Sequence, residues 1–345
     1  MKKIFTLFLT ICISVLPAIA EEHLNEYMNI SFWQKFNDEN LTDNLLKMYE
    51  NNNDLKAAVL KVNEANRVVK MSFANELPSL GFEGYVGRIF KSSDEIFGDI
   101  VIPNYAETHY YFPITMNYEI DIWGQNHLKT KSKKKQLEII RQDERSAYIY
   151  ISSAFVANYY NLIRFDKLID YQKELISIQE QIINSYKIRY MLGTATISNI
   201  DNAEKELTYM KEDLHKLFEK QKILKNQLSV LLSDRTFDDI PRADYDDLNV
   251  NFEAPEGIDF NILSSRPDRI KTELELERIG IDVKIAKRDF LPKFIITGNL
   301  GFNLYNISSP HTFLANLGVA PIWDLFLGGR KIHLLRSEER RVGKE

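Results

Sequence analysis

The sequence has 345 residues, of which 44% are hydrophobic and 12% aromatic, and a formal net charge of -5 at pH 7. It contains no stretch that interleaves aromatic with basic residues, so we set a nucleic-acid-binding protein aside. The single cysteine, Cys12, lies in an N-terminal apolar segment. A mature chain that has lost this segment can form neither a disulfide nor a thiolate site.

Residues 1–20 are predicted to be a secretory signal peptide. Lys2 and Lys3 precede an apolar run from Ile4 to Leu16, and residues 18–20 (Ala-Ile-Ala) match a small-x-small cleavage site. The apolar run is shorter than the ~20 residues of a membrane-spanning helix, which favours export with cleavage over a membrane anchor. Since no cysteine follows the cleavage site, we expect no lipid anchor there.

The region 21–125 is predicted to contain N-terminal helices followed by a pair of strands. One helix begins near Asp54, which is placed to cap it, and its apolar residues recur at helical spacing as far as Pro78. After Pro78 the hydrophobic period changes from 3.6 to 2. We expect strands at about residues 80–90 and 109–122, joined by a polar loop over residues 91–107.

Residues 109–122 have the clearest strand pattern. Fourteen residues at ~3.3 Å each, tilted by ~45°, rise about 32 Å, close to the ~30 Å hydrocarbon core of a bilayer. A half-buried strand of a water-soluble sheet would alternate similarly, but here the apolar face is unbroken, large and aromatic-rich at its start. Strands in lipid must close into a barrel, because an open edge cannot be satisfied there. We predict that the apolar face meets lipid (Tyr110, Phe112, Ile114, Met116) and that the polar face lines a lumen (Thr115, Asn117, Glu119, Asp121).

The region 126–232 is predicted to form a long antiparallel helical hairpin. Its arms cover residues 126–190 and 196–232, and its tip lies at residues 190–197, where Gly193 provides the turn and Thr196 the N-cap. Periodicity alone would favour a cytosolic coiled coil, but the flanking strands argue against one. The return arm carries an unbroken heptad seam (Ile200, Ala203, Leu207, Met210, Leu214, Leu217, Gln221, Leu224, Leu228, Leu231), and Gln172, Gln179 and Tyr186 occupy seam positions of the outgoing arm.

A second copy of the helix-and-strands unit follows an acidic, turn-rich linker at residues 233–266. Asp268 lies 24 residues before Pro292, just as Asp54 lies 24 residues before Pro78. In this second repeat, residues 267–335, we expect strands at about 293–305 and 312–326. Two repeats supply only four strands, too few to close a barrel, so oligomerisation is implied. We predict that Phe294 and Ile296 face lipid and that Thr297, Asn299 and Asn303 face the lumen.

The sequence contains few patterns typical of catalysis or ligand binding. The six histidines are scattered without metal-ligand spacing, and the acidic linker has no ordered ligand pattern. Glu119 and Asp121 could imitate an acid/base pair, but the polar side of a barrel strand is the simpler setting. Because no phosphate-binding glycine loop or nucleophile motif occurs, we expect no enzyme, no cofactor and no metal site.

Taken together, these motifs resemble the TolC-type outer-membrane efflux proteins, most closely the branch that works with RND-type pumps. That branch often carries an N-terminal lipid-modified cysteine, which this sequence lacks. The resemblance covers nearly all of the mature chain to about Leu335 and rests on the order and duplication of short motifs. These are Trp33 to Phe36, Leu41, Asn53-Asp54-Leu55, Ala65, Pro78, Asp121 to Gly124, Arg189-Tyr190, Gly193, Ala203, Arg266-Pro267-Asp268, Ile279-Gly280, Pro292 and Gly328-Gly329-Arg330.

The resemblance implies a mainly α fold with transmembrane β-strands. Each protomer of a homotrimer would give four strands to a twelve-stranded barrel in the outer membrane of a Gram-negative bacterium, and helical hairpins to a periplasmic tunnel. The channel would passively conduct substrates that an inner-membrane pump and a periplasmic adaptor deliver. The adaptor would dock at the hairpin tip (Arg189, Tyr190, Gly193, Thr196, Ile197).

Three other functions stay open on the sequence. The first is the exit duct of a type I protein secretion system. The second is a periplasmic adaptor, whose helical hairpin interrupts a small glycine-rich domain rather than long strands. The third, a soluble exported enzyme, fits least because the search for catalytic motifs found none.

The last ten residues, 336–345, are anomalous. They match the in-frame translation of a common short-read sequencing adapter, so we expect the genuine protein to be represented only to about Leu335. The family would continue into a second long hairpin. We expect a polypeptide ending here to lack part of its tunnel wall and not to form a working channel.

Overall fold

The computed structural model describes residues 27–91, 96–97, 100–101, 105–234, 240–248, 260–305 and 312–343. The predicted signal peptide and parts of the acidic linker lie outside these ranges. The chain forms two compact units. One comprises the residues up to Leu60 together with Asp143–Leu263, and the other comprises Lys61–Gln142 together with the residues from Ser264 onward. Helices α5 (Asn53–Ala74) and α6 (Gln125–Met191) contribute residues to both units.

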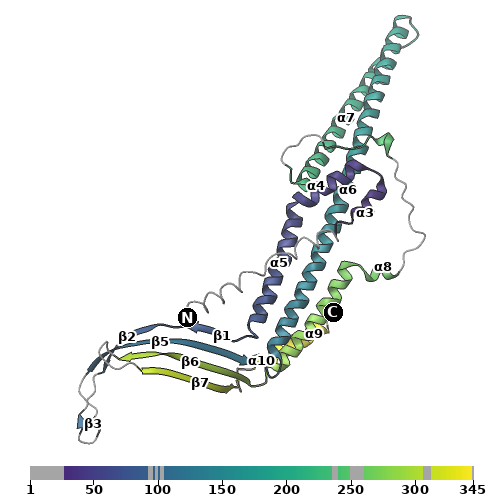
Figure 1. Ribbon diagram of the computed structural model, residues 1–345. Helices are drawn as coiled ribbons and strands as arrows, with labels where there is room; N and C mark the ends of the chain where they lie inside the picture. Colours follow the sequence, from purple (N-terminus) through teal and green to yellow (C-terminus); the bar gives the residue numbers. More distant parts are fainter. Residues whose placement is uncertain are drawn as a thin grey trace. The chain divides into compact units, whose positions relative to one another are not determined.

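The first unit is helical. It contains α3 (Ile30–Trp33), the short 3-10 helix η1 (Gln34–Phe36), α4 (Glu39–Asn51), α7 (Ile197–Leu232), η2 (Tyr245–Asp247) and α8 (Phe260–Ser264), besides its share of α5 and α6. Helices α6 and α7 form the expected antiparallel hairpin, visible at the top of Figure 1. Their bounds agree with the predicted arms to within one residue.

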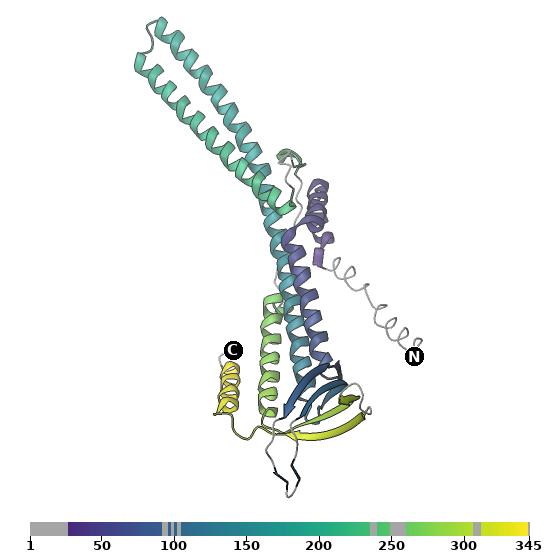
Figure 2. The same cartoon turned by 90° about the vertical axis from the view of Figure 1, so that its left-hand side faces the viewer.

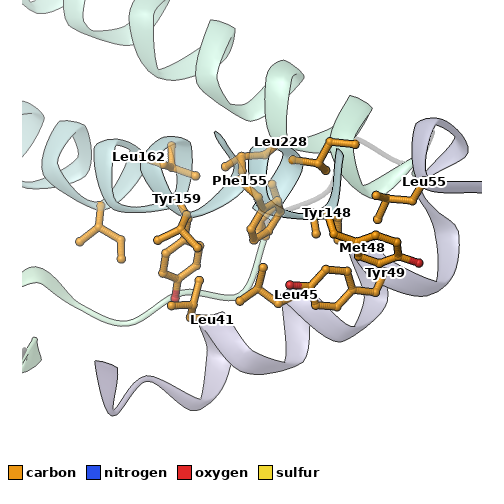
Figure 3. Close-up of a cluster of buried hydrophobic side chains, with 14 residues drawn as sticks. Leu41, Leu45, Met48, Tyr49, Leu55, Tyr148, Phe155, Tyr159, Leu162 and Leu228 are labelled. Atoms are coloured by element: carbon orange, nitrogen blue, oxygen red, sulfur yellow. The ribbon is translucent and has the colours of Figure 1, made fainter. Parts of the chain in front are cut away.

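One cluster of buried side chains holds this unit together. Tyr159, Phe155 and Leu162 of α6 meet Leu41 and Leu45 of α4, and all five are fully inaccessible to solvent (Figure 3). Burying an aliphatic or aromatic side chain of this size stabilises the fold by roughly 1.5–3 kcal/mol. The short helix α4 is therefore fixed by the residues of its inward face.

Residues 240–248, the described part of the linker between α7 and α8, pack against this cluster. Ile240 is buried in it, and the carbonyl of Pro241 accepts a hydrogen bond of 2.8 Å from the Asn44 side chain. The Tyr159 hydroxyl donates to Asp38 at 3.0 Å and accepts from the amide of Ala243 at 3.4 Å. The described part of the linker is thus tied to α4 and α6 by side-chain hydrogen bonds.

Two glutamines set the register of the hairpin. The side-chain amide of Gln172 donates to the carbonyl of Met210 at 2.9 Å, and that of Gln179 donates to the carbonyl of Ala203 at 3.0 Å. On each helix the two partners are one heptad apart. A shift of one residue would break both contacts and would also displace the apolar seam.

Helix α5 begins where we expected, but its cap is a different residue. Asn52, not Asp54, accepts the hydrogen bond from the amide of Leu55 at 2.9 Å. The side chain of Asn52 also donates to the carbonyl of Leu231 at 2.7 Å, which anchors it to the end of α7. Asp54 lies inside the first turn, where a negative charge still favours the helix dipole.

The second unit is built on a five-stranded antiparallel sheet, drawn as a curved ribbon in Figures 1 and 2. Strand β5 (Tyr105–Ile120) pairs on one side with β1 (Ser79–Phe82) and β2 (Tyr85–Lys91), and on the other with β6 (Lys293–Tyr305). Strand β7 (Thr312–Ile322) pairs with β6. The helices of this unit include α9 (Pro267–Arg288) and α10 (Arg330–Val342).

The single strand expected at residues 80–90 is two strands, and Pro113 explains the break. The amide of Glu83 donates to the carbonyl of Pro113 at 3.1 Å, but proline has no N–H with which to complete the pair. The ladder stops at this point and resumes at Tyr85, opposite Tyr111. The sheet therefore has four strand positions. Strands β1 and β2 share the first, and β5, β6 and β7 occupy the other three.

Other strand ends differ from the sequence prediction. Strand β5 begins at Tyr105, because residues 105–108 pair with β2. The segment expected to be a polar loop also holds the short strands β3 (Ile96–Phe97) and β4 (Ile100–Val101). Strand β7 ends at Ile322 rather than 326, because its partner β6 begins opposite at Lys293. Strand β6 covers the range expected from the sequence.

Candidate functional site

The cross-strand register assigns every strand residue to one of two faces, because residues directly opposite each other share a face. Tyr110 lies opposite Leu304, Phe112 opposite Phe302 and Ile114 opposite Leu300. One apolar face therefore continues across all four positions of the sheet. The six residues predicted to face lipid all lie on it: Tyr110, Phe112, Ile114, Met116, Phe294 and Ile296.

This apolar face is open to solvent in the isolated chain. The exposed fraction is 71% for Phe82 of β1 and 73% for Leu317 of β7. Ile114, in the middle of β5, is 51% exposed. Apolar side chains of this size gain free energy when they leave water, so a contiguous exposed face of this kind marks an interaction surface.

The opposite face is polar at its centre. Thr115 lies opposite Asn299, and Asn117 opposite Thr297. Glu119, on the same face, forms an ion pair of 3.8 Å with Lys293. Six of the seven predicted lumen-facing residues lie on this face (Thr115, Asn117, Glu119, Thr297, Asn299, Asn303).

Asp121 is the exception, and its assignment to a strand was wrong. Strand β5 ends at Ile120, and the carboxylate of Asp121 accepts a hydrogen bond of 2.9 Å from the amide of His127 in the first turn of α6. Gly124, with φ +66°, turns the chain between them. Asp121 therefore anchors the start of the long helix.

Two tryptophans mark the end of the sheet from which the helices start. The indole N–H of Trp123 donates to the carbonyl of Pro292 at 2.7 Å, and that of Trp323 donates to the carbonyl of Phe290 at 3.0 Å. Both side chains are otherwise exposed, by 40% and 58%. Tryptophan with a bound N–H and a free ring face is typical of the boundary between a membrane and water.

Charged side chains gather at the same end. The ammonium group of Lys129 donates to the side chain of Asn126 at 3.0 Å. Burial lowers the pKa of Lys129, and the positive charge of Lys293 lowers it further, while Glu119, Asp289 and Asp121 act in the opposite direction. The end of the sheet from which the helices start thus carries both lysines and carboxylates.

The second candidate surface is the tip of the α6–α7 hairpin. Helix α6 ends in a Schellman motif, in which the amide of Thr194 donates to the carbonyl of Arg189 at 2.8 Å and that of Gly193 to Tyr190 at 3.0 Å. Gly193 has φ +72°, which a side chain would strain. Thr196 precedes α7, and its amide donates to the side chain of Asn199 at 3.0 Å. These bonds shape a defined turn.

The tip is apolar as well as exposed. Tyr190 is 48% exposed and Ile197 is 55% exposed. Met191 and Leu192, which the sequence pattern did not indicate, are also at the tip, with exposed fractions of 76% and 73%. Their position just after the last seam residue of α6 would have pointed to them.

A second apolar stripe runs along α6, apart from the seam that faces α7. Its members recur at steps of three and four, and each is between 39% and 52% exposed. A heptad stripe on an exposed helix face is typical of helices that pack against a further helix. The residues are Leu168, Tyr171, Leu175, Ile178 and Ile182.

Within the described ranges, no helix is both long and apolar enough to cross a bilayer. The described residues also contain no group of three or more His, Cys, Asp and Glu side chains that could hold a metal ion.

An amphipathic sheet joined to a long helical hairpin defines the class of outer-membrane channel subunits. A model of the family described as outer membrane efflux protein matches residues 45–233, more than half of the chain. The chain belongs to this family, whose members form channels and are not enzymes.

Relatives and solved structures agree with this assignment. The chain is 20% identical over 295 residues to the cation efflux system protein CusC of Escherichia coli O157:H7, covering 83% of this chain and 60% of that protein. It is 22% identical over 324 residues to the pyoverdine export outer membrane protein OpmQ of Pseudomonas aeruginosa, covering 90% of this chain and 65% of OpmQ. The chain thus spans less than two thirds of these relatives.

The same fold occurs in solved outer-membrane channels. The Campylobacter jejuni CmeC channel superposes with a TM-score of 0.82 at 21% identity, covering 92% of this chain and 68% of CmeC. The Vibrio cholerae protein VceC gives 0.75 at 19% identity, covering 90% of this chain and 75% of VceC. The predicted fold class, mainly helical with a partial barrel from each protomer, is confirmed.

Proposed function

We propose that this chain forms part of an outer-membrane channel that passively conducts substrates out of the cell. The observation that carries the proposal is the register of the sheet, which puts an exposed apolar face and a polar face back to back over four strand positions. In a closed barrel the apolar face meets lipid and the polar face lines the lumen. No bond is made or broken in this function.

The channel is a homotrimer. In the part of the chain that the structure describes, the outer edges of β1/β2 and of β7 have no partner strand. Open edges cannot persist in hydrocarbon, so each edge pairs with the complementary edge of another copy. Three copies with four strand positions each give the twelve-stranded barrel, and the second apolar stripe of α6 packs in the wall of a periplasmic helical tunnel.

The hairpin tip is the docking site for a periplasmic adaptor. Exposed Met191 and Leu192 extend the predicted surface of Arg189, Tyr190, Gly193, Thr196 and Ile197. Apolar side chains on a rigid turn suit burial against a partner helix or loop. The adaptor connects the channel to an inner-membrane pump, which completes a tripartite efflux system.

The relatives' names support export but differ in cargo. CusC is named for cation efflux, OpmQ for pyoverdine export, and an Aggregatibacter actinomycetemcomitans relative for toxin and drug export. We assign efflux with an RND-type pump as the function. The exit duct of a type I protein secretion system is the second candidate, since the relative named for toxin export is 22% identical over 315 residues.

Single-cysteine labelling tests which face meets lipid. Cys12 lies in the predicted signal peptide, so a mature chain carries only the introduced thiol. Thr115→Cys, on the polar face, should react with a membrane-impermeant maleimide in intact outer membranes, whereas the adjacent Ile114→Cys should react only after detergent is added. Equal labelling of the two thiols in intact membranes would refute the channel.

Adaptor docking has a separate test. Leu192→Asp should reduce co-purification with the adaptor, because it puts a charge into an apolar contact. Val230→Asp is the matched control, since Val230 is also 73% exposed but lies at the other end of α7. If both variants bind the adaptor equally well, the tip is not the docking site.

A further inference from the structure

A cluster of rings occupies the polar face of the sheet at the end remote from the helices. The ring of His109 in β5 neighbours those of Tyr85 in β2 and Tyr111 in β5, two residues that lie directly opposite each other. The centroids of the Tyr85 and His109 rings are 6.0 Å apart and nearly perpendicular, at 71°. The rings of His109 and Tyr111 are 6.4 Å apart and stacked, at 18°. These three residues form what we call the ring cluster.

The cluster is held in place from two sides. A ring nitrogen of His109 is hydrogen-bonded to the side-chain oxygen of Asn303 on β6, and Asn303 is only 7% exposed. On β2, Gly87 lies beneath the Tyr85 ring, and a Cβ atom there would collide with it. The ring cluster is therefore positioned by two neighbouring strands, while the Tyr85 ring keeps 52% of its surface open.

The face of the ring cluster carries a carboxylate, Glu107, and beyond it the position of Lys91, which lies opposite Tyr105. Glu107 precedes His109 by two residues on β5 and so shares its face, opposite Ile89 of β2. The guanidinium group of Arg88 belongs to the other face, where it lies 5.3 Å from the centroid of the Phe90 ring. Aromatic faces attract cations and stack on planar rings, and a nearby carboxylate strengthens the preference for positive charge.

We propose that the ring cluster is a cargo-binding site for planar aromatic cations, near the exit of the channel. This inference rests on the proposed function, because the polar face must line the lumen for cargo to reach it. In a trimer, three copies of the ring cluster would surround the pore. The stacked pair His109 and Tyr111 and the open face of Tyr85 provide the contacts, and Glu107 provides the complementary charge.

Block of ion current by ethidium, a planar aromatic cation, tests the proposal. The protein, produced from its own gene, is inserted into planar bilayers and titrated with ethidium. Tyr111→Leu should raise the half-blocking concentration about fivefold, the effect of losing one ring contact to a cation. Tyr110→Leu is the matched control, because Tyr110 is the adjacent residue on the apolar face.

The outcomes separate this inference from the channel itself. A normal current with the same ethidium block in Tyr111→Leu and in Tyr85→Leu as in the unaltered protein would overturn the ring cluster as a cargo site and leave the channel standing. Equal loss of block in Tyr111→Leu and Tyr110→Leu would also overturn it, since the effect would then not depend on the face. A protein that conducts no current at all would overturn the channel and the cargo site together.

Discussion

The two units of the chain differ in how far their apolar side chains are buried. In the first unit Phe155 and Leu162 are completely buried against α4, within a cluster supplied by the chain itself. In the sheet of the second unit, Phe82 and Leu317 are more than 70% exposed. The first unit gains its hydrophobic stabilisation within one chain, whereas the apolar face of the sheet needs an apolar surrounding from outside. This contrast separates a core that the chain completes by itself from an apolar surface that the isolated chain leaves exposed.

The largest expected effect is in the first unit. Phe155→Ala should destabilise it by about 3–5 kcal/mol, because the lost ring leaves a cavity in a close-packed cluster. Tyr150→Ala on the same helix, where Tyr150 is 75% exposed, should stay within about 0.5 kcal/mol. Denaturant unfolding followed by circular dichroism measures both variants. Similar losses in the two would mean that α6 is not buried on the side we describe.

A charge on the sheet should matter on one face only. Ile114→Lys should destabilise the assembled barrel by about 2–4 kcal/mol, the cost of a lysine near the bilayer midplane, while Thr115→Lys should cost much less. Folding into lipid vesicles, read as heat-modifiable migration on a gel, compares the two adjacent variants. If Thr115→Lys is the more damaging, the faces are assigned the wrong way round.

A smaller loss is expected for Asp38→Ala. The carboxylate of Asp38 caps α4 through the amide of Leu41 at 3.0 Å and accepts the hydrogen bond of the buried Tyr159 hydroxyl. Losing a cap and leaving a buried donor unpaired should together cost about 2 kcal/mol. Asp43→Ala, at an exposed position of the same helix, is the control. Thermal unfolding should distinguish them, and equal melting temperatures would contradict the buried network.

The smallest effect at neutral pH is expected for Tyr148→Phe. The Tyr148 hydroxyl is buried and has no hydrogen-bond partner among the described residues, so its removal should change stability by less than about 0.5 kcal/mol. Burial, reinforced by the negative charge of Glu144, raises the pKa of Tyr148 to about 12 from 10.0. Ionisation is therefore easier in the unfolded chain, and the stability contribution is complete below pH 10 and lost as the pH rises toward 12.

Unfolding at alkaline pH tests whether ionisation of Tyr148 lowers the stability of the folded chain. Between about pH 10 and 12, Tyr148→Phe should lose less stability than the unaltered chain, although Tyr160, whose pKa burial also raises to about 12, still contributes. Denaturant titrations across this range, with tyrosinate absorbance as a second signal, provide the measurement. If the unaltered chain and Tyr148→Phe lose the same free energy of unfolding over this pH range, Tyr148 is not buried in the folded state.

The sequence predicted those features that depend on local periodicity. The alternation in residues 109–122 assigned Tyr110 and Thr115 to opposite faces, and the heptad seam located the hairpin arms. Both patterns follow from the geometry of a single element. The turn at Gly193 was equally local, because a left-handed backbone favours glycine.

Features that depend on partners far along the chain escaped the prediction. Asn52 caps α5 and also binds Leu231, 179 residues away, which no local pattern reveals. The interruption of the strand ladder at Pro113 could not be predicted either, because it depends on which strand lies beside the position where proline lacks an N–H. The ring cluster likewise requires the register between β2, β5 and β6, which brings Tyr85, His109 and Asn303 together. These contacts could not be predicted because the partners lie far apart in the sequence, not because the interactions are weak.

The glutamine contacts of the hairpin also constrain how its length can change. Gln172 and Gln179 reach carbonyls one heptad apart on the opposite helix. If the arms are lengthened or shortened between these two contacts, both survive only when each arm changes by the same multiple of seven residues. Each such step would move the tip by about 10 Å. The reach of the hairpin therefore changes in steps, and a variant with longer or shorter arms has to be built in whole heptads on both arms.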